Sequence, residues 1–136
     1  MSLYGKAVYS ILKADTAITA ITGLRIYPNV IPQTARERSE GLPVIVFEKI
    51  SNNQDHNMGN DNTPEHPLYT IHCLALTYFD AETLRDAVIS AMNNYNGDIG
   101  GATIQWIFME NNWDNYIAAT DTHDLMVDFR VWADRT

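Results

Sequence analysis

The stretch that decides the fold of this chain runs from residue 11 to 47 and contains GLRIYP (23–28), PQ (32–33) and LPVIVF (42–47). Gly23 can end a helix in a left-handed conformation, and residues 25–27 have the composition of a strand. Pro28 and Pro32 exclude regular structure from the connection that follows. The chain then enters a second strand at Pro43. This order predicts helices and strands that alternate along the chain.

Hydrophobic periodicity predicts the remaining elements. Apolar residues at helical spacing predict a helix over 2–14, and Asp15 can cap a further short turn that runs to Ile21. A second main helix is expected to begin at Asp80 and to stop at Gly97. Five segments read as strands: 24–27, 44–50, 68–78, 104–108 and 125–132.

This element order predicts the fold class. We expect an α+β fold, with a mostly antiparallel β-sheet of four or five strands and two main helices packed on one face. The apolar run Val44–Phe47 indicates a strand that is covered on both faces. With 136 residues and neither a repeat nor an interdomain linker, residues 1–136 are expected to form a single domain.

Composition limits the function classes. The hydrophobic fraction of 46% is typical of a globular protein, and no apolar run approaches the ~20 residues of a membrane span. The N-terminus lacks the features of a secretory signal, and the single cysteine, Cys73, cannot form an intramolecular disulfide. We therefore expect a soluble protein made in a cytoplasm.

Charge argues against nucleic-acid binding. The chain has 9 Lys and Arg against 17 Asp and Glu, a net charge of -8. A protein that binds phosphate backbones needs a clustered basic face. The nearest candidate is Arg36-Glu37-Arg38, where the glutamate offsets part of the field. DNA that passes close to such an acidic protein would be repelled and would slide.

Candidate catalytic and metal-binding residues give weak signals. His72 and Cys73 are neighbours in an expected strand, where side chains alternate, so they should point to opposite faces and cannot form a dyad. His56 and His66 share a segment with three acidic residues, but the spacing fits neither a calcium loop nor a zinc site. We expect no catalytic residue, no metal and no cofactor.

Two further patterns could in principle bind phosphate or catalyse acid/base chemistry. GDIGG (97–101) follows a helix and lacks the lysine of a phosphate loop, so we interpret it as a turn. Four carboxylates, Asp114, Asp121, Asp124 and Asp128, could include an acid/base pair, but nothing else that a catalytic site needs accompanies them.

Two long connections, expected at 52–67 and 111–122, are candidates for function because loops of this length in compact domains are usually functional or disordered. The first carries Met58, and the second carries Trp113, Tyr116 and Ile117. Apolar side chains in such places either fold back onto the domain or anchor an interface. We expect these four residues to be interface residues.

The quoted stretch, together with Leu12, Asp15 and Ile21, resembles the tail-completion proteins of long-tailed bacteriophages, also called tail terminators or head-to-tail joining proteins. The resemblance implies a structural virion protein and no enzymatic activity. It implies a homo-oligomeric ring, commonly a hexamer, at the head-proximal end of the tail. That ring ends polymerisation of the tail tube and binds the head-closure protein of the neck.

The same resemblance implies further partners and a location. DNA passes through the lumen of the ring without specific binding, no membrane is involved, and assembly takes place in the cytoplasm of the host bacterium. The alternative from another class is a small cytoplasmic α+β enzyme or ligand-binding domain with a site near His56 and His66.

Overall fold

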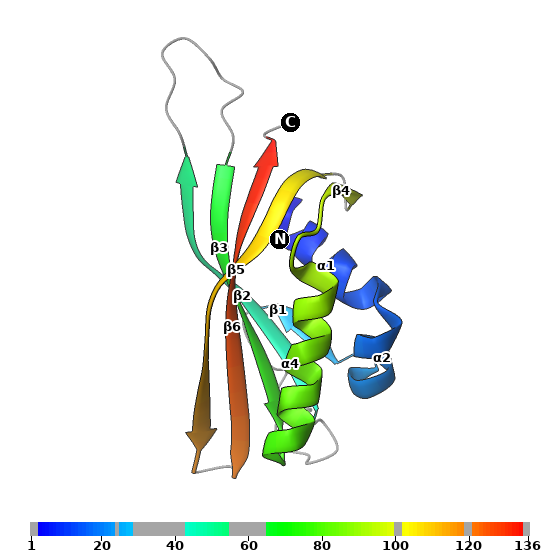
Figure 1. Ribbon diagram of the computed structural model, residues 1–136, viewed down its shortest axis with the longest axis vertical. Coiled ribbons are helices and arrows are strands. Elements are labelled where there is room, and N and C mark those ends of the chain that lie inside the picture. The colour runs from blue at the N-terminus through cyan, green and yellow to red at the C-terminus, as the bar shows by residue number, and fades with distance from the viewer. Residues whose placement is uncertain are drawn as a thin grey trace.

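The computed structural model describes residues 3–23, 25–28, 43–54, 65–99, 102–118 and 121–134. These ranges contain the helices α1 (Leu3–Ala14), α2 (Thr16–Thr22) and α4 (Tyr78–Met92). They also contain six strands: β1 (Ile26–Pro28), β2 (Val44–Gln54), β3 (Glu65–Ala75), β4 (Gly97–Ile99), β5 (Ala102–Ile117) and β6 (Thr122–Asp134). The strands form one sheet in the order β1-β2-β3-β6-β5-β4 (Figure 1).

The expected sheet of four or five mostly antiparallel strands with two main helices is wrong. The sheet has six strands and is mixed, because β1 pairs with β2 in parallel while every other pair is antiparallel. Residues 29–43 connect β1 to β2, and a connection of that length permits a parallel crossover. The sixth strand is β4, which begins at Gly97 within the segment that was expected to be a turn. The third helix is α2, which was expected as a short turn.

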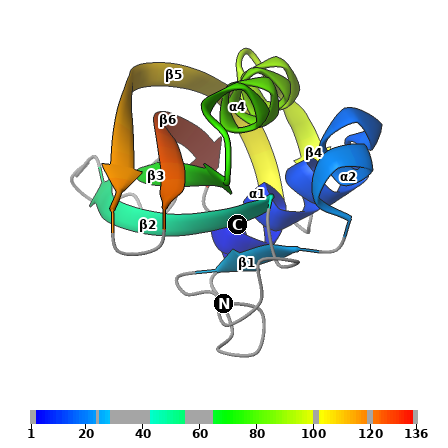
Figure 2. The same ribbon diagram turned by 90° about the horizontal axis from the view of Figure 1, so that it is seen from below.

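The sheet is strongly curled, and α1 lies inside the curl (Figure 2). Helix α1 contacts β1 at one edge of the sheet and both β4 and β5 at the other. The two ends of the strand order therefore approach the same helix. We call the side that faces the helices the concave face and the opposite side the convex face.

The main core lies between the concave face and the three helices. Side chains that alternate along β2, β3 and β6 meet the apolar stripes of α1, α2 and α4 in one buried cluster. Its largest fully buried members include Tyr69, Phe129, Leu12, Ile18, Ile45, Ile71, Leu84, Met92 and Ile107. On β2 the expected cover on both faces is confirmed, since Val44 to Phe47 are all buried.

Local signals position the helix ends. The Asp15 carboxylate accepts a hydrogen bond from the amide of Ile18 at 3.0 Å, which confirms this residue as a helix cap. Gly23 ends α2 as predicted, with a φ of 63° that favours glycine, but its ψ of -125° differs from the left-handed helical conformation that was expected. None of the helices in the described ranges is long and apolar enough to cross a bilayer.

The expected boundaries of α4 are wrong. Thr77, not Asp80, is the N-cap, and its hydroxyl oxygen accepts a hydrogen bond from the amide of Asp80 at 3.2 Å. The helix ends before Gly97, with Asn93 as its C-cap, because the amide of Asn93 already bonds to the carbonyl of Ile89. Two candidate caps three residues apart cannot be ranked from composition alone, since Thr and Asp are both favoured at this position.

The strands extend further than the sequence predicted. Strand β5 continues to Ile117, so residues 111–117 are strand and not the expected loop. Asparagine and aspartate disfavour strands, but the long ladder with β6 overrides that preference. A register shift between Met109 and Asn111 also breaks the alternation on which the prediction relied. Of the other expected loop, residues 52–54 and 65–67 are strand, and 55–64 lie outside the described residues.

Candidate interaction surfaces

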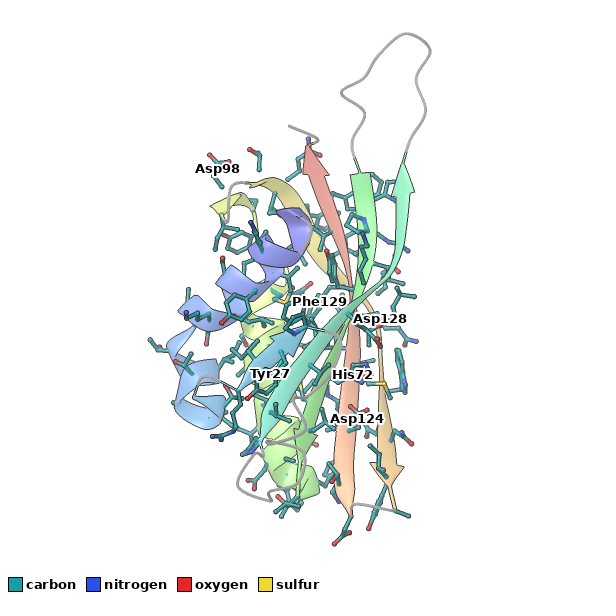
Figure 3. The ribbon with its side chains drawn as sticks, turned by 180° about the vertical axis from the view of Figure 1, so that it is seen from behind. Tyr27, His72, Asp98, Asp124, Asp128 and Phe129 are labelled. Atoms are coloured by element: carbon teal, nitrogen blue, oxygen red, sulfur yellow. The ribbon has the colours of Figure 1, made fainter. Side chains whose placement is uncertain are left out.

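A row of polar side chains crosses the convex face on β2, β3 and β6 (Figure 3). His72 lies at its centre, with Nε2 2.8 Å from Oε1 of Glu48 and Nδ1 3.1 Å from Oδ2 of Asp124. Two residues before His72, on the same face of β3, the Thr70 hydroxyl donates to Asp128 at 2.6 Å. The row is therefore a hydrogen-bonded seam that joins three neighbouring strands.

The seam favours a charged imidazole. The hydrogen bond that His72 donates to Asp124 raises the pKa of His72 to about 9, with a further increase from Glu48 and an opposing decrease from burial. The imidazolium donates from both ring nitrogens, so each carboxylate has a cationic partner. Neither nitrogen is left to act as a base or a metal ligand. The arrangement supports a structural role for His72.

Cys73 lies on the other side of the same strand, as predicted. It is fully buried on the concave face, and burial raises the pKa of its thiol. Its side chain therefore stays a neutral thiol in the core, on the opposite face from the imidazole of His72. The two adjacent residues do not form a dyad.

The four candidate carboxylates have separate partners. Asp124 and Asp128 belong to the convex seam, while Asp114 accepts from Arg85 at 2.5 Å and from the hydroxyl of Tyr78 at 3.3 Å. Asp121 accepts a hydrogen bond from the hydroxyl of Tyr116. Each carboxylate is thus engaged in a contact that holds elements of the fold together.

The histidines considered for a metal site separate as well. His66 is the second residue of β3 and stacks on Trp132, with ring centroids 4.3 Å apart, whereas His56 lies outside the described residues. In the ranges that the structure describes, no three His, Cys, Asp or Glu side chains are placed to hold a metal ion. No observation of the described residues favours the alternative of an enzyme or ligand site near these histidines.

Of the four expected interface residues, Met58 lies outside the described residues and the other three lie on β5. Trp113 is level with Met126 and faces the convex side, where it is 39% exposed. Ile117 also faces that side and packs against a small apolar cluster around Val44. Tyr116 points to the concave side and is 46% exposed. These side chains do not form one patch.

Tyr116 belongs to a group that sequence reasoning missed. We call it the lower aromatic group, because the start of α4, the end of β5 and the start of β6 lie at the lower end of Figure 1, and it comprises Tyr78, Phe79, Tyr116 and His123. Tyr116 stacks on His123 with centroids 5.0 Å apart, and Tyr78 lies edge-on to both His123 and Phe79. Phe79 is 75% exposed. The sequence did contain a signal for this group. Tyr78 and Phe79 begin α4 but lie outside its stripe of buried residues.

A second aromatic group lies at the opposite end of the same strands. This upper aromatic group comprises His66, Trp106, Phe108 and Trp132 on the convex face. Trp106 contacts Phe108 with centroids 4.7 Å apart and is 47% exposed. Arg130 lies beside the group, where it donates to Glu110 at 3.1 Å and to the carbonyl of His66 at 3.0 Å. Exposed aromatic side chains therefore gather at both ends of the elongated sheet.

Comparisons with known proteins relate this chain to virion components. No curated protein matches the chain. Among solved structures, a chain from the virion of a native gene transfer agent particle superimposes with a TM-score of 0.73 at 15% sequence identity. The match covers 98% of this chain and 98% of the other. At that identity the likeness shows the fold alone.

The family comparison is more specific. The model of the family described as tail completion protein gp17 matches residues 6–134. The match confirms the resemblance to tail-completion proteins that residues 11–47 indicated. The chain belongs to the tail completion protein gp17 family, whose members are structural proteins of the virion tail.

Proposed function

We propose that this protein forms a ring at the head-proximal end of a phage tail, ends polymerisation of the tail tube and joins the tail to the neck. The observation that carries the proposal is the family match over residues 6–134, nearly the whole chain. The proposed partners are further copies of the chain, the tail tube protein and the head-closure protein, and the hexamer is the proposed ring. Assembly would take place in the cytoplasm of the host.

The distribution of exposed aromatic side chains supports a protein that binds one partner at each end of its sheet. The upper and lower aromatic groups lie at opposite ends of β5 and β6. Aromatic residues at the centre of an interface supply much of its binding energy. A joining protein needs separate surfaces for the tube and for the neck, and the two groups meet that requirement.

The proposed interface residues follow from this arrangement. Trp113 and Tyr116 lie on opposite faces of β5, near the same end of the strand. A partner that contacts both would have to enclose the end of the β5–β6 hairpin, since the two faces of a sheet cannot contact one flat surface. We propose Tyr116, with the lower aromatic group, for one of the tube and neck partners, and Trp113 and Ile117 for a neighbouring copy in the ring. Met58 remains a proposed contact residue outside the described ranges.

The negative charge supports a passive relation to DNA. With a net charge of -8, a ring of this chain has a strongly negative field. Such a lumen would repel the phosphate backbone and let DNA slide through without specific binding.

The test replaces aromatic side chains and counts joined particles. Trp113→Ala and Tyr116→Ala are introduced singly. Trp113→Phe and Tyr116→Phe are the controls, because each keeps an aromatic side chain at its position. Both residues are more than a third exposed, so each alanine variant should fold with a melting temperature near that of the wild type. We expect a loss of tails joined to heads, or tails of uncontrolled length, for the alanine variants only.

Imaging of the particles supplies the independent readout. The proposal requires multiple copies in a ring at the junction between tail and head. A single copy per particle, or a location away from that junction, would overturn it. Alanine variants that fold and still give uniform, fully joined tails would show that these two residues are not interface residues.

A further inference from the structure

Two long strands extend beyond the strands that cover them. Strand β2 has 11 residues, but β1 pairs only with Ile45 to Phe47. Strand β5 has 16 residues, but β4 pairs only with Ala102 to Ile104. Within the described ranges, no strand pairs with the outer edge of β2 over 48–54 or of β5 over 110–117.

The turn after α4 covers only a little more of β5. The amide of Asn94 and the carbonyl of Tyr95 bond to the backbone of Ile107, and the side chain of Asn93 accepts from the amide of Met109 at 3.1 Å. These contacts stop at Met109. Among the described strands, the next eight residues, 110–117, pair only with β6, and α4 contacts them through side chains, where Arg85 and Tyr78 bond to Asp114. Eight strand residues span about 26 Å at ~3.3 Å per residue.

The edge of β5 lacks the devices that usually protect edge strands. Natural sheets discourage edge pairing with short strands, lysine, proline or unpaired charge. Residues 110–117 contain neither lysine nor proline. The two charges in the segment are neutralised inside the subunit, because Glu110 pairs with Arg130 and Asp114 pairs with Arg85. This edge is therefore suited to accept another strand.

We propose that the β5 edge over 110–117 binds the β2 edge over 48–54 of a second copy, so that the sheet continues from one subunit to the next. This inference rests on the proposed ring, for which it supplies the contact between neighbouring subunits. A head-to-tail ring needs two different and complementary surfaces on each copy. The two edges lie on opposite sides of the strand order, which satisfies that need.

Strand direction agrees with this pairing. The pairs β2–β3, β3–β6 and β6–β5 are all antiparallel, so β2 and β5 run in opposite directions within one copy. A second copy in the same sheet orientation therefore has its β2 antiparallel to β5. Because 48–54 is level with 104–111 across the sheet, pairing with 110–117 also displaces the second copy along the strands. Such a stagger closes around a ring when the strands are inclined to the ring axis. The lengths also agree, with seven residues on one edge and eight on the other. An antiparallel ladder along this length would satisfy the edge amides and carbonyls of both strands.

Side chains beside the two edges are complementary in charge and polarity. Lys49 is level with Tyr69 and Asp114 is level with Leu125, so both charged groups lie toward the concave side. Ile50, beside the register shift of β2, is 54% exposed and could cover the exposed indole of Trp113. Pairing β5 with β5 of another copy would instead be a two-fold contact between identical surfaces, which closes a dimer and cannot continue around a ring. We therefore favour the β2 edge as the occupant.

The test uses cysteines on the two edges. Ile50→Cys and Asn115→Cys are made singly and together, and assembled particles are treated with a short bismaleimide whose reach covers small differences in register. The natural Cys73 is fully buried and does not compete. Ser90→Cys, on the exposed side of α4, replaces Ile50→Cys in the matched control.

The double variant Ile50→Cys with Asn115→Cys should give a ladder of cross-linked subunits up to the copy number of the ring. Each single variant, and the control that combines Ser90→Cys with Asn115→Cys, should remain monomeric. As a second measurement, amides of 110–117 should gain protection from hydrogen exchange in assembled particles relative to the isolated subunit.

The outcomes separate the two proposals. A ring seen at the tail end without the ladder and without amide protection would overturn the edge pairing and leave the proposed function in place. Cross-linking of Asn115→Cys to itself would show that the occupant is the β5 edge of another copy, which also overturns this inference. Absence of any ring would overturn the proposed function itself.

Discussion

The seam around His72 makes stability depend on pH in a defined window. His72 is held between Glu48 and Asp124, and its pKa rises from 6.5 to about 9 on folding. The folded state therefore binds this proton more tightly than the unfolded state does. Its contribution to stability is fully present below pH 6.5 and is lost as pH rises from 6.5 to 9.

The structure sets the size of this effect. A pKa difference of about 2.5 corresponds to about 3.4 kcal/mol, since one pKa unit is about 1.4 kcal/mol. The side chain of Glu48 is 38% exposed, so water screens part of the attraction. We therefore expect about 2 kcal/mol for the seam as a whole.

The perturbation is His72→Gln, which replaces the imidazole with an amide of similar length. The amide can still form hydrogen bonds but does not titrate. Urea unfolding of the wild type and the variant is followed from pH 6 to pH 9.5. At pH 6 the variant should be less stable by about 2 kcal/mol. The gap should close above pH 9, where the wild-type imidazole is neutral. Lysine and tyrosine groups common to both proteins cancel in the comparison.

The control is Ser90→Gln, which places the same side chain on the exposed side of α4 and changes no titratable group. Its unfolding free energy should keep the same pH dependence as the wild type over this window. A constant difference between wild type and His72→Gln from pH 6 to 9.5 would refute the reasoning. In that case His72 would stabilise the sheet by packing or by neutral hydrogen bonds.

Three further predictions concern the fold. Thr77→Ala should lower the free energy of unfolding by about 1 kcal/mol through loss of the α4 cap, whereas Thr77→Ser should restore it; equal losses in urea melts would argue against capping. Gly23→Ala should cost about 1 to 3 kcal/mol although a Cβ meets no atom within 4 Å, because only the φ of 63° opposes it, and an unchanged thermal midpoint would contradict this. Phe129→Ala, in the fully buried core, should cost about 3 to 5 kcal/mol, and calorimetry showing a loss below about 1 kcal/mol would mean that the cluster is loosely packed.

Several features could be predicted from the sequence because neighbouring residues determine them. The cap at Asp15 and the helix end at Gly23 depend on a side chain or a backbone angle within one turn; both positions are confirmed, although the ψ of Gly23 is not that of a left-handed helix. The opposite faces of His72 and Cys73 follow from the period of a strand. The family resemblance depended on the order of short motifs between residues 11 and 47, and the family match over 6–134 confirms it.

The extent of β5 could not be predicted in this way. Its second half is rich in asparagine and aspartate, which alone favour a loop. It becomes a strand because each of these residues lies beside an apolar or hydrogen-bonding position of β6. This part of the prediction was wrong because strand formation there depends on the partner strand and not on local preference. The placement of the proposed interface residues changed with it.

The sequence by itself determined the ends of α2, the periodic apolar faces and the family of this protein, because each depends on residues close together in the chain. Tertiary structure alone decided the parallel β1–β2 pair, the seam at His72 and the two edges that no described strand covers. The partners of His72 lie 24 and 52 residues away, on different strands. Only the register of the folded sheet brings such residues together, and no local preference along the chain encodes that register.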